Sequence, residues 1–107
     1  MTAKYLWEIL VPTVRPDKPG RYFTTRFHLV WDEKVRKISK GLTIFKPAHG
    51  EWVAPDGELF RERMIPVRVF CTPGEIELIA NLVASHYSQK AVMFYRVSDL
   101  VKIKHFS

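Results

Sequence analysis

Cysteine is almost absent from this chain, because Cys71 is the only one among 107 residues. A single cysteine excludes an internal disulfide framework and any zinc site built from several cysteines. Free cysteine is usually a small buried hydrophobe, so we expect Cys71 to be buried. Its place just before an expected helix would lower its thiol pKa only if it were exposed.

Long apolar runs are also missing, which excludes a membrane-spanning helix. Residues 1–10 lack the charged lead, apolar core and small-residue cleavage site of a secretory signal, so the expected location is the cytoplasm. The chain is nevertheless 47% hydrophobic and 13% aromatic, too much for a disordered protein. Its length fits one folded domain covering residues 1–107.

Sequence motifs of the common catalytic and metal sites are absent. The chain has no glycine-rich phosphate loop, nucleophile elbow or kinase-like segment. The histidines His28, His49, His86 and His105 show no metal-ligand spacing. We therefore expect no metal and no cofactor, and we favour a non-enzymatic protein.

Alternating apolar residues predict three strands. They cover residues 4–12, 59–71 and 91–97, and Pro66 indicates a bulge in the second of these because proline cannot donate to a ladder. Residues 42–45 and 51–53 look extended before the turn Pro55-Asp56-Gly57, which predicts a hairpin with a bent first arm.

Two helices are expected between these strands. Apolar spacing of three and four predicts one helix over residues 26–40, with Thr24 or Thr25 as its N-cap. The run Thr72-Pro73-Gly74-Glu75 is a capping box that starts a second helix reaching about Ser88. The proline-rich stretch 12–25 is predicted to be a long loop, and residues 98–107 a C-terminal tail.

The order strand, helix, strand, strand, helix, strand predicts an α+β ferredoxin-like plait. In this fold a four-stranded antiparallel sheet carries both helices on one face. The other face, which we call the open face, is expected to hold large apolar side chains: Leu6, Leu10, Met64, Phe70, Val92 and Phe94. Such a patch exceeds what monomers usually expose. We expect a homodimer to cover it; the alternative cover is the tail.

Charged residues on the open face give a candidate site. Glu8, Arg68 and Arg96 are expected on adjacent strands there, either as an interface ion cluster or as a pocket in which spare arginine charge holds a small anion. His49 is expected in a loop, where it would act as an acid or base only if it faced a cleft. A small enzyme or anion-binding dimer is thus one alternative function.

Nucleic-acid binding is a further alternative, because the formal net charge is +6. The candidate contacts lie in the loop and on the first helix: Arg15, Lys18, Arg21, Lys34 and Lys37. Acidic residues interrupt both groups, and the aromatic RNA-binding motif is absent from the third strand. These observations favour an ordinary solvated surface.

Several short motifs support the fold independently. Gly41-Leu42-Thr43, Gly50-Glu51-Trp52, Pro55-Asp56-Gly57-Glu58 and the run 89–93 resemble small uncharacterised bacterial and phage proteins of ferredoxin-like, dimeric α+β barrel type. The resemblance implies a fold and no catalytic residues. We therefore expect a homodimeric binding or accessory protein, with a protein partner recognised by the 12–25 loop and the first helix.

Overall fold

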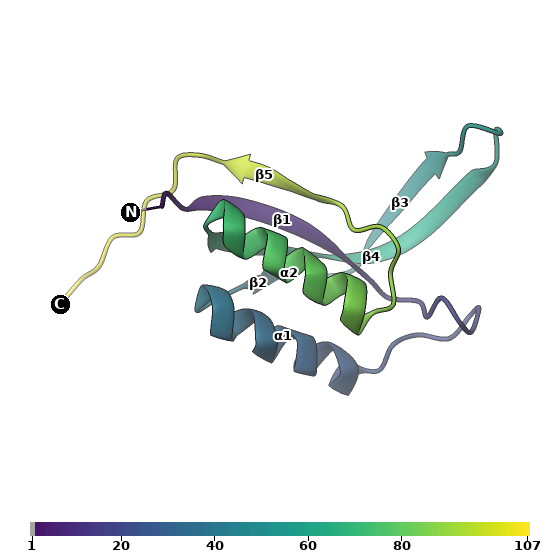
Figure 1. The fold of residues 1–107 in the computed structure, drawn as a ribbon, viewed down its shortest axis with the longest axis horizontal. Coiled ribbons are helices and arrows are strands. Elements are labelled where there is room, and N and C mark those ends of the chain that lie inside the picture. Colours follow the sequence, from purple (N-terminus) through teal and green to yellow (C-terminus); the bar gives the residue numbers. More distant parts are fainter. Residues whose placement is uncertain (1) are drawn as a thin grey trace.

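A computed structural model describes residues 2–107 and has the predicted order of elements (Figure 1). Its strands and helices are β1 Tyr5–Pro12, α1 Thr25–Ser39, β2 Thr43–Ile44, β3 Ala48–Val53, β4 Leu59–Cys71, α2 Pro73–His86 and β5 Phe94–Ser98. The predicted ferredoxin-like plait is confirmed. None of the helices in the described part of the chain is long and apolar enough to span a membrane.

The sheet is antiparallel, with β1 between β4 and β5. Strands β2 and β3 pair with successive parts of the other edge of β4. Together they form the bent first strand of the hairpin that the sequence predicts. The bulge expected at Pro66 is wrong, because β1 and β4 stay in register throughout their pairing. The Pro66 carbonyl accepts a hydrogen bond from Phe45 N. Pro66 has no N–H to donate on the same edge of β4, and this edge faces the interruption between β2 and β3.

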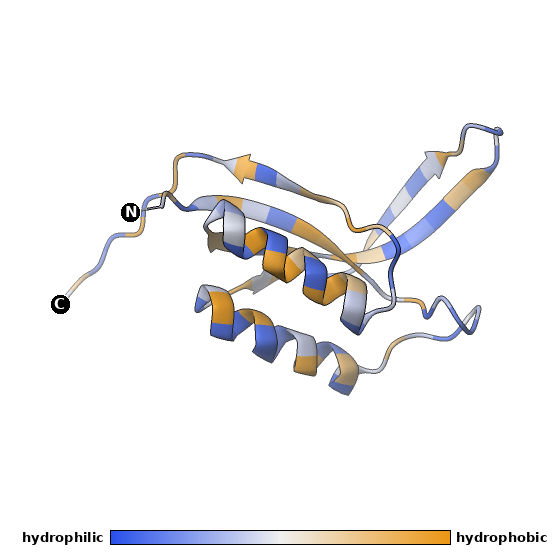
Figure 2. Ribbon diagram, viewed as in Figure 1, coloured by the Kyte–Doolittle hydropathy of each residue, from blue (hydrophilic) through white to orange (hydrophobic). Residues whose placement is uncertain are grey.

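Both helices cover one face of this sheet and end in well-formed caps. Thr24 accepts a hydrogen bond from Phe27 N at the start of α1, and the predicted capping box of Thr72 and Glu75 is present in full. Lys40 caps the end of α1 in the left-handed conformation, with φ at 69°. α2 carries more hydrophobic residues than α1 along its length (Figure 2).

The core lies between the helices and the odd-numbered residues of β1 and β4. It consists of Trp7, Ile9, Val11, Trp31, Val35, Val67, Val69, Cys71, Ile76, Ile79, Ala80, Val83 and Tyr87. The Trp7 indole donates to the Cys71 carbonyl at 3.0 Å, which joins the two central strands inside the core. The predicted side-chain alternation of β1 and β4 is therefore correct.

The hairpin β3–β4 leaves the body of the domain as an arm, which Figure 1 shows at the upper right. Trp52 and Phe60 stack on it with ring centroids 4.6 Å apart, although Trp52 is 48% exposed. The arm and the tail give the molecule a longest dimension of 51 Å.

The two irregular segments behave differently. The 12–25 loop is tied back by a bridge between Val14 and Tyr22 and by the Thr13 hydroxyl, which donates to the Arg63 carbonyl. The tail instead extends away from the sheet, with Leu100 and Phe106 mostly exposed (Figure 1). Ile103 of the tail lies beside Leu6 and Phe70 at one end of the open face, and the tail leaves the rest of that face uncovered, so the tail does not supply the expected cover.

Candidate functional site

A carboxylate with two donors lies at the centre of the open face. Glu8 on β1 stands between Arg68 on β4 and Tyr95 on β5. The Arg68 Nε donates to Glu8 Oε1 at 3.0 Å, and the Tyr95 hydroxyl donates to Glu8 Oε2. The side chain of Glu8 is only 12% exposed. Both carboxylate oxygens are thus satisfied within the sheet, which lets a charged residue stay among apolar neighbours.

Arg96 does not join this cluster, so its predicted place is wrong. It lies opposite Trp7, on the side of the sheet that faces the helices. Its guanidinium carbon lies 3.9 Å from the Tyr5 ring centroid, and its NH1 is 3.2 Å from Asp99 Oδ1. Stacking and an ion pair therefore hold Arg96 away from Glu8.

Two of the six expected interface residues, like Arg96, lie on the helix-facing side of the sheet and not on the open face. Val92 and Phe94 pack against the helix-facing core, and Phe94 lies opposite Ile9. Predicting them on the open face is wrong, because the side-chain alternation of β5 is the opposite of the expected one. The structure places these apolar residues on the open face: Leu6, Leu10, Phe45, Met64, Phe70, Met93, Tyr95 and Val97.

His49 lies in strand β3 of the arm, opposite Arg63, and not in a loop as expected. Its Nε2 is 3.8 Å from Glu51 Oε2, and both side chains are largely exposed. The structure thus separates His49 from Glu8 and Arg68, and the predicted grouping of these three residues is wrong.

A groove opens where the start of β1, the end of α1 and the inner end of β4 meet. Its volume is about 440 Å³, and it is bordered by Lys4, Lys40, Thr43, Arg68 and the apolar residues Leu6 and Phe70. We call it the cationic groove, because its lining residues include three basic side chains and no acidic one. Sequence reasoning singled out Arg68, counted Lys40 only among the basic residues of the first helix and missed Lys4; both lysines are remote from Arg68 in sequence.

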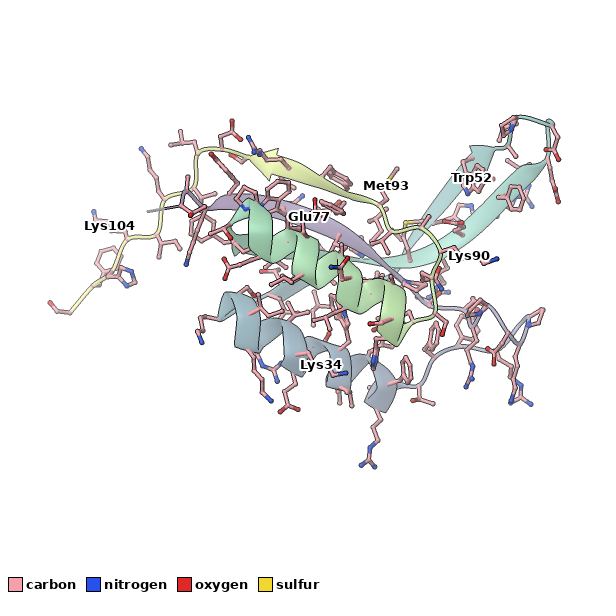
Figure 3. All side chains as sticks on the ribbon, viewed as in Figure 1. Lys34, Trp52, Glu77, Lys90, Met93 and Lys104 are labelled. Carbon is pink, nitrogen blue, oxygen red and sulfur yellow. The ribbon has the colours of Figure 1, made fainter. Side chains whose placement is uncertain are left out.

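The candidate polyanion contacts are only partly available. Arg15 forms an ion pair with Asp17 at 3.1 Å, and Lys37 forms one with Glu33 at 3.7 Å. Lys18, Arg21 and Lys34 are exposed on the loop and the outer side of α1. Figure 3 shows Lys34 pointing away from the domain body. Polyanion binding by this surface remains a prediction.

A second groove of about 420 Å³ lies beside the 12–25 loop, lined in part by Tyr22, His28 and Arg63. Behind it, His28 Nδ1 lies 2.7 Å from the Tyr87 hydroxyl, which is fully buried. Burial and then the nearby His86 lower the pKa of His28 below its ordinary 6.5. His86 is itself packed, with Nε2 2.7 Å from the Phe27 carbonyl, as the sequence predicts.

The lowered pKa of His28 makes stability depend on pH. Well above pH 6.5 this imidazole is neutral in both states, whereas below that pH the unfolded chain binds the proton more readily. We expect the free energy of unfolding to fall between pH 7 and pH 5 through this group, because the unfolded chain takes up the proton first. Urea unfolding of the wild type and of His28→Gln at both pH values measures it, and an equal pH dependence of the two proteins would contradict the expectation.

Nucleophilic and metal chemistry find little support in the described residues. Cys71 is buried, and burial raises its thiol pKa to about 12, so the thiolate is disfavoured at neutral pH. Within residues 2–107 no group of three or more His, Cys, Asp or Glu side chains is arranged to hold a metal ion.

Comparison with known proteins gives structural likeness only. No protein-family model matches the chain, and no curated protein matches it in sequence. Three solved structures illustrate the likeness. The divalent cation tolerance protein CutA1 from Thermus thermophilus has a TM-score of 0.63 and 9% identity, over 97% of this chain and 87% of that one. CutA1 from Oryza sativa has a TM-score of 0.65 and 7% identity, over 97% and 85% of the two chains.

The third is a phage SAM lyase in complex with S-methyl-5′-thioadenosine. Its TM-score is 0.65 at 14% identity, over 92% of this chain and 84% of that one. Identities this low establish the fold and leave activity open. The chain therefore has the α+β ferredoxin-like fold that the CutA proteins and the phage lyase also have.

Proposed function

We propose that this chain is a binding protein that works as a homo-oligomer, in which copies stack their open faces. The observation that carries the proposal is the uncovered apolar side of the sheet. Met93 is 65% exposed there, Tyr95 43% and Val97 37%, and Figure 3 shows Met93 pointing away from the helices. Contiguous apolar surface of this kind is typical of protein interfaces.

A second copy of the chain fits this surface better than other covers. The tail leaves the sheet uncovered, and a twofold contact lets one apolar patch cover its own copy. The charges at its centre do not oppose burial, because Glu8 is paired with Arg68 and also accepts from Tyr95. A satisfied ion pair can be buried, whereas a lone carboxylate could not.

The names of the structural neighbours indicate two ligand classes to consider for this chain. Divalent cations find no cluster of carboxylate, imidazole or thiol ligands in residues 2–107. S-methyl-5′-thioadenosine is uncharged, so it would bind through stacking, apolar contacts and hydrogen bonds to its adenine and ribose rather than through ion pairs. The geometry favours neither as strongly as it favours self-association, and binding assays with both compounds are the direct check.

A charge placed on the open face tests the proposal. Met93→Glu should weaken self-association about tenfold, because each new interface would bury an unpaired carboxylate. Sedimentation equilibrium should give the wild type a mass that is a multiple of 12.5 kDa, with the variant shifted towards that value. The matched control is Leu78→Glu on the outer side of α2, where Leu78 is 54% exposed, and its mass should equal that of the wild type. A wild type that stays monomeric at high concentration would overturn the proposal.

A further inference from the structure

The cationic groove has a composition that fits a specific class of ligand. Three of its lining side chains carry positive charge, Lys4, Lys40 and Arg68, and no lining residue is acidic. Lys40 Nζ lies 3.5 Å from the Lys37 carbonyl, a contact that leaves its charge uncompensated. Like charges gathered around one hollow raise the local potential and favour an anion there.

Arg68 is held in a fixed orientation at the edge of this groove. Its Nε donates to Glu8, and its guanidinium carbon lies 5.0 Å from the Phe45 ring centroid. Its two terminal nitrogens make no hydrogen bond to any of residues 2–107. A guanidinium anchored through Nε with its terminal fork free is arranged to bind two oxygens of a phosphate or carboxylate.

The other lining residues indicate which kind of anion the groove can bind. Leu6 and Phe70 are apolar, and Leu42 and Ile103 add to that surface. Arg68 shares its charge with Glu8 outside the groove, whereas the structure gives Lys4 and Lys40 no acidic partner among residues 2–107, so the lining matches a dianion better than the single charge of a carboxylate. A volume of about 440 Å³ lies within the range of small-molecule sites.

We propose that the cationic groove binds a phosphate monoester with an apolar or aromatic organic part, and that Arg68, Lys4 and Lys40 hold its phosphate. This site goes beyond the proposed self-association and does not require it; because Leu6, Phe70 and Arg68 also lie on the open face, both proposals hold together only where the stacked copies leave this end of the face uncovered. Met93 lies at the other end of the open face, at the start of β5, so the two proposals can fail separately.

Phenyl phosphate is a suitable probe because it joins a dianionic phosphate to an aromatic ring. Calorimetric titration at pH 7.5 and low salt should show binding at least tenfold tighter than that of benzoate or inorganic phosphate, and weaker binding as salt rises. Arg68→Gln should weaken binding of phenyl phosphate about tenfold. The matched control is Arg61→Gln on the arm, where Arg61 is paired with Glu51, and its affinity should equal that of the wild type.

Lys40 allows binding to be separated from folding. Its φ of 69° is a conformation that glycine adopts without strain, so Lys40→Gly should raise Tm by about 4 °C while it weakens phenyl phosphate binding several-fold. Ser88→Gly is the control, because Ser88 has a φ of 56° and does not line the groove. It should raise Tm without changing affinity.

The outcomes are distinguishable. If the Met93→Glu protein dissociates but binds phenyl phosphate as tightly as the wild type, the result supports a site that is independent of self-association. Affinity that is the same in Arg68→Gln, Lys40→Gly and the wild type would overturn the site. Binding seen only in the dissociated Met93→Glu protein would overturn a site that works in the assembled protein, since the stacked copies would then cover the groove.

Discussion

Trp31→Ala should lower the free energy of unfolding by about 3–5 kcal/mol. Trp31 is completely buried between α1 and the sheet, where it packs against Tyr87 with ring centroids 6.1 Å apart. Removing the indole deletes most of its apolar contact and leaves a cavity that the surrounding strands cannot fill. Since a domain of this size has a total stability of about 5–15 kcal/mol, this loss removes a large fraction of it.

Two further substitutions show whether burial is the cause. Leu29→Ala on the same helix should cost well under 1 kcal/mol, because Leu29 is 57% exposed. Trp31→Phe should cost much less than Trp31→Ala, since it keeps a ring and removes the indole N–H, which has no acceptor among residues 2–107. Urea unfolding followed by circular dichroism measures all three. Similar losses for Leu29→Ala and Trp31→Ala would contradict this packing.

Glu8→Ala should have the second largest effect, a loss of about 2 kcal/mol. The carboxylate accepts from Arg68 and Tyr95 on the two neighbouring strands, so its removal leaves both donors without their partner, although Arg68 and Tyr95 are themselves 39% and 43% exposed. Hydrogen bonds to charged groups contribute more than neutral ones, and a guanidinium that loses its anion also loses its orientation. Glu8 is thus a positioning residue for Arg68.

An exposed ion pair supplies the control for Glu8→Ala. Glu51 pairs with Arg61 on the arm at 3.1 Å, with side chains 48% and 68% exposed. Glu51→Ala should cost less than about 1 kcal/mol, because water screens pairs of this kind. Urea unfolding of both variants gives the comparison, and equal losses would show that the open-face cluster contributes no more than a surface pair.

Much of the fold could be predicted from local patterns. The capping box at Thr72 starts α2 at Pro73, and the alternation along β1 and β4 places Ile9 and Val67 in the core. These signals are local, since a cap or an alternating strand is specified by neighbouring residues. The interruption between β2 and β3 is predictable for the same reason, because Pro47 prevents a continuous arm.

The prediction failed at β5, where the sequence does not determine which side faces the helices. Both sets of its residues are largely apolar, with Val92 and Phe94 in one set and Met93, Tyr95 and Val97 in the other. The choice depends on register with β1, which includes a shift between Leu6 and Trp7. A register slip of one residue exchanges the two faces of a strand, so Arg96 and Tyr95 exchanged their expected places.

The cationic groove was beyond sequence reasoning for a different reason. Lys4, Lys40 and Arg68 come from three separate parts of the chain, and only the packing of α1 beside β4 brings them together. Lys4 and Lys40 alone look like ordinary surface residues, and Arg68 was expected in a cluster with Glu8 and Arg96. When folding brings together residues that are remote in sequence, their spacing follows no motif, so the sequence alone does not reveal the site.

The length of β4 also determines how the molecule opens. Its inner residues are flanked by β1 on one edge and β2 on the other, whereas its outer residues 59–63 pair with β3 alone. A two-stranded ribbon is barely stable without further cover. Amide protection should therefore decline along one unbroken strand, from the domain centre towards the tip, and the arm can fray while the residues around Val69 remain closed.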